Sequence, residues 1–120
     1  MSLNKSVIAQ WTAALTSGNY SQGTGALRRP EETFCCFGVL CDLYAQEHPE
    51  ATWIAPLDET NTYGFSFDQD AQGIQGLAPT RVMQWAGLTA AFDRLVVMND
   101  AGHTFPEIVQ EINRLVAIGE

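Results

Sequence analysis

The chain has 120 residues, of which 46% are hydrophobic and 17% charged, which is typical of a single globular domain over residues 1–120 and excludes a disordered chain. Six Lys and Arg residues against 14 Asp and Glu residues give a formal net charge of −8 at pH 7. Nonspecific nucleic-acid affinity comes from neutralising many phosphates, so this balance argues against general nucleic-acid binding. No apolar run approaches the roughly 20 residues of a membrane span, and the N-terminus lacks a secretion signal, so we expect an intracellular protein without membrane contact.

The first third of the chain predicts two helices joined by a glycine-rich segment. Residues 3–17 form the first helix, and Gly18 ends it. Four of its apolar residues fall on one stripe at helical spacing: Val7, Trp11, Ala14 and Leu15. The glycine-rich segment, residues 18–30, follows, and the second helix is predicted over residues 33–47.

The middle of the chain is rich in aromatic residues and predicts a small β-hairpin. Its two strands are placed at residues 53–55 and 63–67, and the second alternates large and small side chains with period 2. Residues 58–62 connect them, and residues 68–76 are predicted to form a polar loop. The start of this loop is similar to a calcium-binding loop, but Pro79 stands where such a loop needs glutamate.

The last third predicts further helices. Pro79 opens a third helix that Gly87 closes, and residues 92–98 fit either a short fourth helix or a strand. Thr104 and Glu107 have the spacing of a capping box at the start of the last helix. The predicted fold is therefore mainly α (α+β), with four to five short helices and a small β-hairpin insertion.

Three cysteines lie in the second predicted helix, at positions 35, 36 and 41. Zinc sites usually contain a Cys pair separated by two to four residues, and at about 100° per residue these three thiols cannot converge from one helix. We therefore expect Cys35, Cys36 and Cys41 to pack in the core, and we expect no metal. Gly38 in the same helix predicts a close contact with another backbone segment.

His103 lies near Asp100 and Glu107 in the sequence, an arrangement from which a general base could be built. However, no nucleophile motif, metal-binding histidine pair or phosphate-loop lysine accompanies it. We therefore expect a non-enzymatic protein with no catalytic residue and no cofactor.

The glycine-rich segment contains Gly23-Thr24-Gly25-Ala26-Leu27-Arg28, which is similar to a dinucleotide-binding fingerprint. It follows a predicted helix instead of a strand, and Arg28 replaces the third small residue, so that interpretation fails. Glycines still let backbone amides approach an anion, and arginine offers two parallel donors to phosphate.

We therefore predict an anion-binding site here. In it Arg28 and Arg29 pair with phosphate, Gln22 and the glycine amides donate hydrogen bonds, and an aromatic ring stacks on the ligand. The residues of this predicted ligand site are Tyr20, Gln22, Gly23, Gly25, Arg28, Arg29 and Trp53. The alternative is a plain loop whose arginines pair with local carboxylates, namely Glu31, Glu32 or Asp42.

Several motifs together resemble a known family. They are Trp11, Gly18-x-Tyr20-x-Gln22, Gly25-x-Leu27-Arg28, Cys35-Cys36-x-Gly38-Val39-Leu40-Cys41-Asp42, Pro79-x-x-Val82-x-x-Trp85-Ala86-Gly87-Leu88 and Asn99-Asp100-x-Gly102-x-Thr104-Phe105. In these motifs the chain resembles a family of small, functionally uncharacterised proteins that bacteriophages and prophages encode. The resemblance excludes about residues 49–76, and Phe37 replaces a leucine of the family pattern. It implies a phage origin and action in the host cytoplasm, and it carries no activity.

A phage origin favours a non-enzymatic accessory protein that binds an anionic, nucleotide-like ligand. Such a protein resembles those that sequester nucleotide signals of bacterial immunity, often as homo-oligomers. The alternative is a protein–protein inhibitor or regulator of a host factor, which would use the hairpin aromatics as an exposed surface; these are Trp53, Tyr63, Phe65 and Phe67. A third interpretation is a hydrolase of a nucleotide signal that uses His103. Ligand, host target and oligomeric state stay open.

Overall fold

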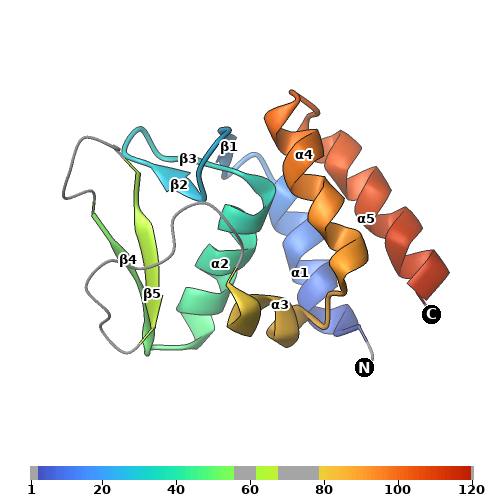
Figure 1. Cartoon of the computed structure of the whole chain (residues 1–120), viewed down its shortest axis with the longest axis horizontal. Helices are drawn as coiled ribbons and strands as arrows, with labels where there is room; N and C mark the ends of the chain where they lie inside the picture. Colours follow the sequence, from blue (N-terminus) through green and yellow to red (C-terminus); the bar gives the residue numbers. More distant parts are fainter. Residues whose placement is uncertain (1–2, 56–61, 68–78, 120) are drawn as a thin grey trace.

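The computed structural model describes residues 3–55, 62–67 and 79–119, and these residues form a mainly helical α+β fold (Figure 1). The elements in chain order are α1 (Lys5–Thr16), β1 (Ser21–Gln22), β2 (Arg28–Arg29), β3 (Thr33–Phe34), α2 (Cys36–Glu47), β4 (Ala51–Ile54), β5 (Gly64–Phe67), α3 (Thr80–Ala86), the 3-10 helix η1 (Ala90–Asp93), α4 (Arg94–Asp100) and α5 (Phe105–Gly119). The predicted fold class is confirmed. None of the helices in these residues is long and apolar enough to cross a membrane.

Helix α2 lies in the middle of the molecule, with the two sheets on one side and α1, α4 and α5 on the other (Figure 1). It packs against α1, α3, α4, β3 and β4. Its residues Cys36, Val39, Leu40 and Cys41 are completely buried, because neighbours cover several faces of the helix.

The three cysteines are free thiols buried in this core, as expected from their spacing. Burial raises the pKa of all three thiols above the ordinary value for cysteine, because a thiolate is poorly solvated there. In the described part of the chain, no three His, Cys, Asp or Glu side chains gather closely enough to hold a metal ion.

Gly38 makes the close backbone contact that its place in α2 predicts. A Cβ atom at this position would collide with the carbonyl oxygen of Leu27. Leu27 itself is completely buried. The glycine-rich segment is therefore pressed directly onto the central helix, and it does not form a separate loop.

The sequence-based boundaries are wrong around residues 18–35, where a small sheet replaces the predicted loop and the start of the second helix. β3 is the middle strand. It pairs in parallel with β1 (Ser21 opposite Thr33) and antiparallel with β2 (Arg29 opposite Thr33). Helix α2 begins only at Cys36, after Cys35, whose Sγ accepts a hydrogen bond from the Gly38 amide. Strands of two residues have no periodicity that a sequence could show.

The predicted hairpin is confirmed as the antiparallel pair β4–β5, with Trp53 opposite Phe65. Residues 58–61 of its connection and the predicted polar loop at residues 68–76 lie outside the described residues. The hairpin aromatics do not form the exposed surface that the sequence suggests. Phe65 is fully buried, and Trp53 and Phe67 pack half-buried against the core. The rings of Phe65 and Phe67 pack edge-to-face against the ring of Tyr44 on α2.

The C-terminal third follows its sequence signals. Pro79 precedes α3, and Gly87 ends it in the left-handed conformation with φ +72°. Residues 92–98 are helical, because η1 continues directly into α4. The capping box is present: the Thr104 amide donates to Glu107 Oε1 (2.8 Å), and the Glu107 amide donates to Thr104 Oγ1 (3.3 Å).

Candidate functional site

The side chain of Gln22 fastens the small sheet to the turn between α4 and α5. Its Nε2 donates to Asn99 Oδ1 (3.0 Å) and to the His103 carbonyl (2.6 Å), and its Oε1 accepts from the Phe105 amide (3.0 Å). Both amide protons and the oxygen of Gln22 therefore have partners inside the protein. Gln22, which the sequence predicts to bind a ligand, therefore connects two parts of the fold by hydrogen bonds.

Asn99 is completely buried and extends the same network. Its Oδ1 also accepts from the Cys36 amide (3.2 Å), and its Nδ2 donates to the Gly23 carbonyl (2.7 Å). The side-chain amide of Asn99 thus links Gln22, Gly23 and Cys36 to α4.

The two glycine amides that are predicted to hold an anion are also bound internally. The Gly25 amide donates to Asp100 Oδ1 (3.0 Å), and the Gly23 amide donates to the Phe34 carbonyl (2.8 Å). Arg29 Nε donates to the Thr24 carbonyl (3.0 Å), which closes the turn. An anion does meet the glycine-rich segment, and it is the carboxylate of Asp100.

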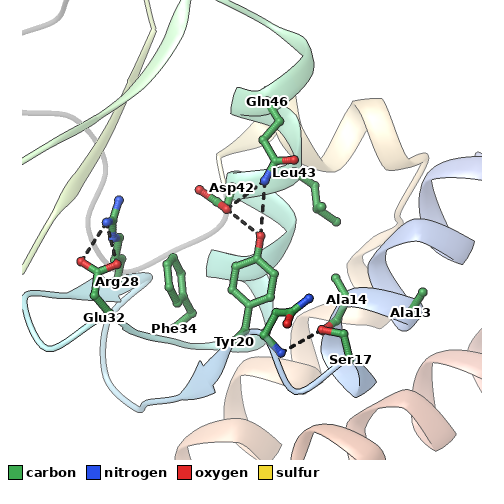
Figure 2. A pocket seen from close by; sticks show the side chains of 11 residues that line it. Ala13, Ala14, Ser17, Tyr20, Arg28, Glu32, Phe34, Asp42, Leu43 and Gln46 are labelled. Atoms are coloured by element: carbon green, nitrogen blue, oxygen red, sulfur yellow. Dashed lines mark hydrogen bonds and ion pairs between the residues drawn. The ribbon is translucent and has the colours of Figure 1, made fainter.

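Two of the predicted site residues, Tyr20 and Arg28, instead line a pocket of about 630 Å³ between α1, α2 and the small sheet (Figure 2). The lining residues are Ala13, Ala14, Ser17, Asn19, Tyr20, Arg28, Glu32, Phe34, Asp42, Leu43 and Gln46. Gln22, Gly23, Gly25, Arg29 and Trp53 are not among them.

Asp42 is the polar centre of one wall of this pocket. Its Oδ2 accepts from the Tyr20 hydroxyl (2.6 Å) and from Gln46 Nε2 (3.2 Å), and its Oδ1 accepts from Trp53 Nε1 (3.0 Å). Burial, followed by the hydrogen bond to Asp42, raises the pKa of Tyr20 above its ordinary value. Tyr20 is therefore a neutral hydrogen-bond donor, and Trp53 supports the pocket from behind Asp42.

Aromatic rings hold Arg28 in place in the pocket lining. Its guanidinium carbon lies 4.3 Å from the ring centroid of Tyr63, 5.4 Å from Phe34 and 5.5 Å from Trp53, within the range of cation–π attraction. Figure 2 shows Phe34 between Arg28 and Tyr20.

Glu32 pairs with this arginine from the solvent side. Arg28 Nη2 donates to both carboxylate oxygens of Glu32, at 2.9 and 2.8 Å. The Arg28 side chain is 18% exposed and that of Glu32 is 58% exposed. An ion pair between an arginine of this segment and a local carboxylate, which the plain-loop alternative expects, is therefore present at Arg28. Among the described residues that line the pocket, Arg28 is the one base, and Glu32 and Asp42 are the acids.

His103 lies apart from this pocket. Its Nδ1 is 3.9 Å from Glu107 Oε1, and both side chains are about half exposed. Hydrogen bonds from Thr104 lower the pKa of Glu107, since they stabilise its carboxylate in the capping box. Glu107 therefore has a structural role at the start of α5.

Phe34, Leu43 and Gln46 are among the pocket residues that the sequence does not identify. One signal was available: Asp42 and Gln46 are four residues apart, so a helix places them on one face. The fold exposes that face between α1 and the small sheet, and this placement depends on tertiary contacts alone.

A second, more apolar groove of about 550 Å³ lies between α3 and α4. Its lining residues are Phe37, Thr80, Met83, Gln84, Leu88, Asp93, Val96 and Val97. Val97, one of these lining residues, is 70% exposed.

No curated protein and no solved structure matches the chain. The model of one protein family, described as a domain of unknown function (DUF8296), matches residues 3–116. This match covers nearly the whole chain, so the protein belongs to that family.

Proposed function

We propose that this protein is a non-enzymatic accessory protein that binds a small, nucleotide-like anion in the pocket lined by Tyr20, Arg28 and Asp42. The observation that carries the proposal is the placement of Arg28. Three aromatic rings fix its guanidinium at the pocket wall, and a half-exposed carboxylate is its ion-pair partner. Guanidinium groups held in this way bind carboxylates and phosphates well, because little side-chain freedom is lost on binding.

The rest of the pocket suits the uncharged part of such a ligand. Ala13, Ala14 and Leu43 supply apolar surface, and Tyr20 and Phe34 supply aromatic rings. Gln46 stands at the edge with Asp42 and offers amide groups to the polar rim of a base. The pocket volume of about 630 Å³ is within the range of small-molecule sites.

The proposed ligand site contains only two of the residues that the sequence predicts to bind the ligand, Tyr20 and Arg28. Gln22, the Gly23 and Gly25 amides and Arg29 Nε have partners within the protein, and none of these four residues lines the pocket. They support the pocket by fixing the small sheet on α2. The phosphate interaction is therefore assigned to Arg28.

The phage origin implied by the sequence motifs gives this binding a biological purpose. A phage protein that buries a nucleotide signal in the host cytoplasm removes it from the immune response without chemical change. We propose this sequestration as the function, and the ligand should then be recoverable intact.

Thermal-shift measurements against a panel of nucleotides test the proposal. The panel includes adenosine 3′,5′-cyclic monophosphate, AMP and ATP, and mass spectrometry checks whether the ligand is unchanged. A nucleotide that raises the Tm of the wild type should not raise the Tm of Arg28→Gln. Arg94→Gln is the matched control, since Arg94 is exposed and pairs with Glu111 away from the pocket. No shift with any nucleotide, or an equal shift in Arg28→Gln, refutes the proposed site.

A protein partner is the second candidate, and the groove between α3 and α4 beside the exposed Val97 favours it. A host protein would then co-purify with the wild type and with Arg28→Gln, but not with Val97→Asp. Hydrolysis is the third candidate, and loss of the nucleotide during the same screen would support it.

A further inference from the structure

We infer that the carboxylate of Glu32 occupies the anion subsite of the pocket, and that the ligand group replacing it is a singly charged oxyanion, the phosphodiester of a nucleotide-like ligand. The nucleotide part of this statement rests on the proposed function. The exchange at Arg28 rests on the contacts around Glu32 alone.

Glu32 sits on Arg28 as a bound anion would. Both of its carboxylate oxygens accept from Arg28 Nη2, at 2.9 and 2.8 Å. Both residues line the pocket, so the pair belongs to its surface. A phosphodiester also presents two oxygens with one shared negative charge, and it can take the same position.

The carboxylate of Glu32 can leave while Arg28 stays. The rings of Tyr63, Phe34 and Trp53 hold the guanidinium independently of Glu32, and the Arg28 side chain is only 18% exposed. Glu32, in contrast, is 58% exposed, so water can solvate its carboxylate when it leaves Arg28. An incoming anion then pairs with an arginine that the aromatic rings already hold in place.

The charges around the subsite select the charge of the ligand. Once Glu32 has left, Arg28 is the one positive group among the described lining residues, and Asp42 is the remaining negative group. A ligand with a single negative charge can pair with Arg28. A second charge, as on a phosphomonoester, would meet Asp42 without a further base, so it weakens binding.

Nuclear magnetic resonance titration with dimethyl phosphate, which has one charge and no nucleoside, tests the subsite directly. The Arg28 side-chain signals report binding. Because the Glu32 carboxylate is mostly exposed and competes only weakly, Glu32→Gln should bind dimethyl phosphate about 1.5- to 5-fold more tightly than the wild type. Glu31→Gln removes the same charge from the neighbouring residue, which does not line the pocket. This variant should change the affinity for dimethyl phosphate much less. Methyl phosphate at pH 8, a dianion, should bind more weakly to each protein.

The inference is overturned if Glu32→Gln does not bind dimethyl phosphate, binds it no more tightly than the wild type, or gains no more than Glu31→Gln. Preference for methyl phosphate also overturns it. If these probes behave as expected but no nucleotide binds, the subsite stands and the nucleotide function falls. If a nucleotide binds to the wild type but Glu32→Gln gives no gain, the function stands and the inference falls.

Discussion

Replacement of Asn99 by alanine should destabilise the protein strongly, although Asn99 does not line the pocket. Asn99 is completely buried, and its side chain has three hydrogen-bond partners: the side chain of Gln22, the Cys36 amide and the Gly23 carbonyl. In Asn99→Ala, two backbone groups lose their partners. An unsatisfied buried polar group costs about 1–3 kcal/mol, and the half-buried side chain of Gln22 regains water. The free energy of unfolding should therefore fall by about 2–4 kcal/mol.

Urea unfolding followed by tryptophan fluorescence measures this change. Asn113→Ala is the matched control, because Asn113 is exposed on α5, and it should alter the free energy of unfolding by less than about 0.5 kcal/mol. Gln22→Ala combined with Asn99→Ala should cost less than the sum of the single changes, since both belong to one network. A loss below about 1 kcal/mol in Asn99→Ala would show that this network does not fasten the glycine-rich segment.

Three further predictions follow from the packing and the titratable groups. Gly38→Ala should lower the free energy of unfolding by about 2 kcal/mol or more, because the new methyl group meets the Leu27 carbonyl; urea unfolding within about 0.5 kcal/mol of wild type would contradict it. The pKa of Tyr20 is raised by burial and by Asp42, so its contribution to stability persists up to about pH 10 and is lost as the pH rises further. The difference in 295 nm absorbance between wild type and Tyr20→Phe should titrate above that pH, and a midpoint at or below it would contradict the assignment. The three buried thiols should react with a thiol reagent only on unfolding, and rapid labelling of the native protein would oppose this.

The elements with strong periodicity or end signals could be predicted from the sequence. The stripe of α1, the Pro79 and Gly87 boundaries of α3 and the capping box of α5 depend on residues close in the chain, and all three are present. The small sheet could not be predicted, because its strands have only two residues each. Their pairing depends on how the segment packs on α2.

The candidate site shows the same division. Residue types identify Arg28 and Tyr20 as polar and aromatic groups in a glycine-rich segment, and both line the pocket. The sequence predicts that the Gly25 amide binds a ligand, whereas in the fold this amide donates to Asp100, 75 residues further along the chain. Such a long-range partner is invisible to local pattern analysis, so free donors were expected where bound ones occur.

One titration separates binding in the pocket around Arg28 from binding at the glycines of residues 18–30. Adenosine 3′,5′-cyclic monophosphate is added to ¹⁵N-labelled protein, and amide shifts are mapped onto the structure. We expect the largest changes at residues that line the pocket, including Tyr20, Arg28, Phe34 and Gln46. Changes centred on Gly23 and Gly25, or at the groove between α3 and α4, or no changes at all, would contradict it.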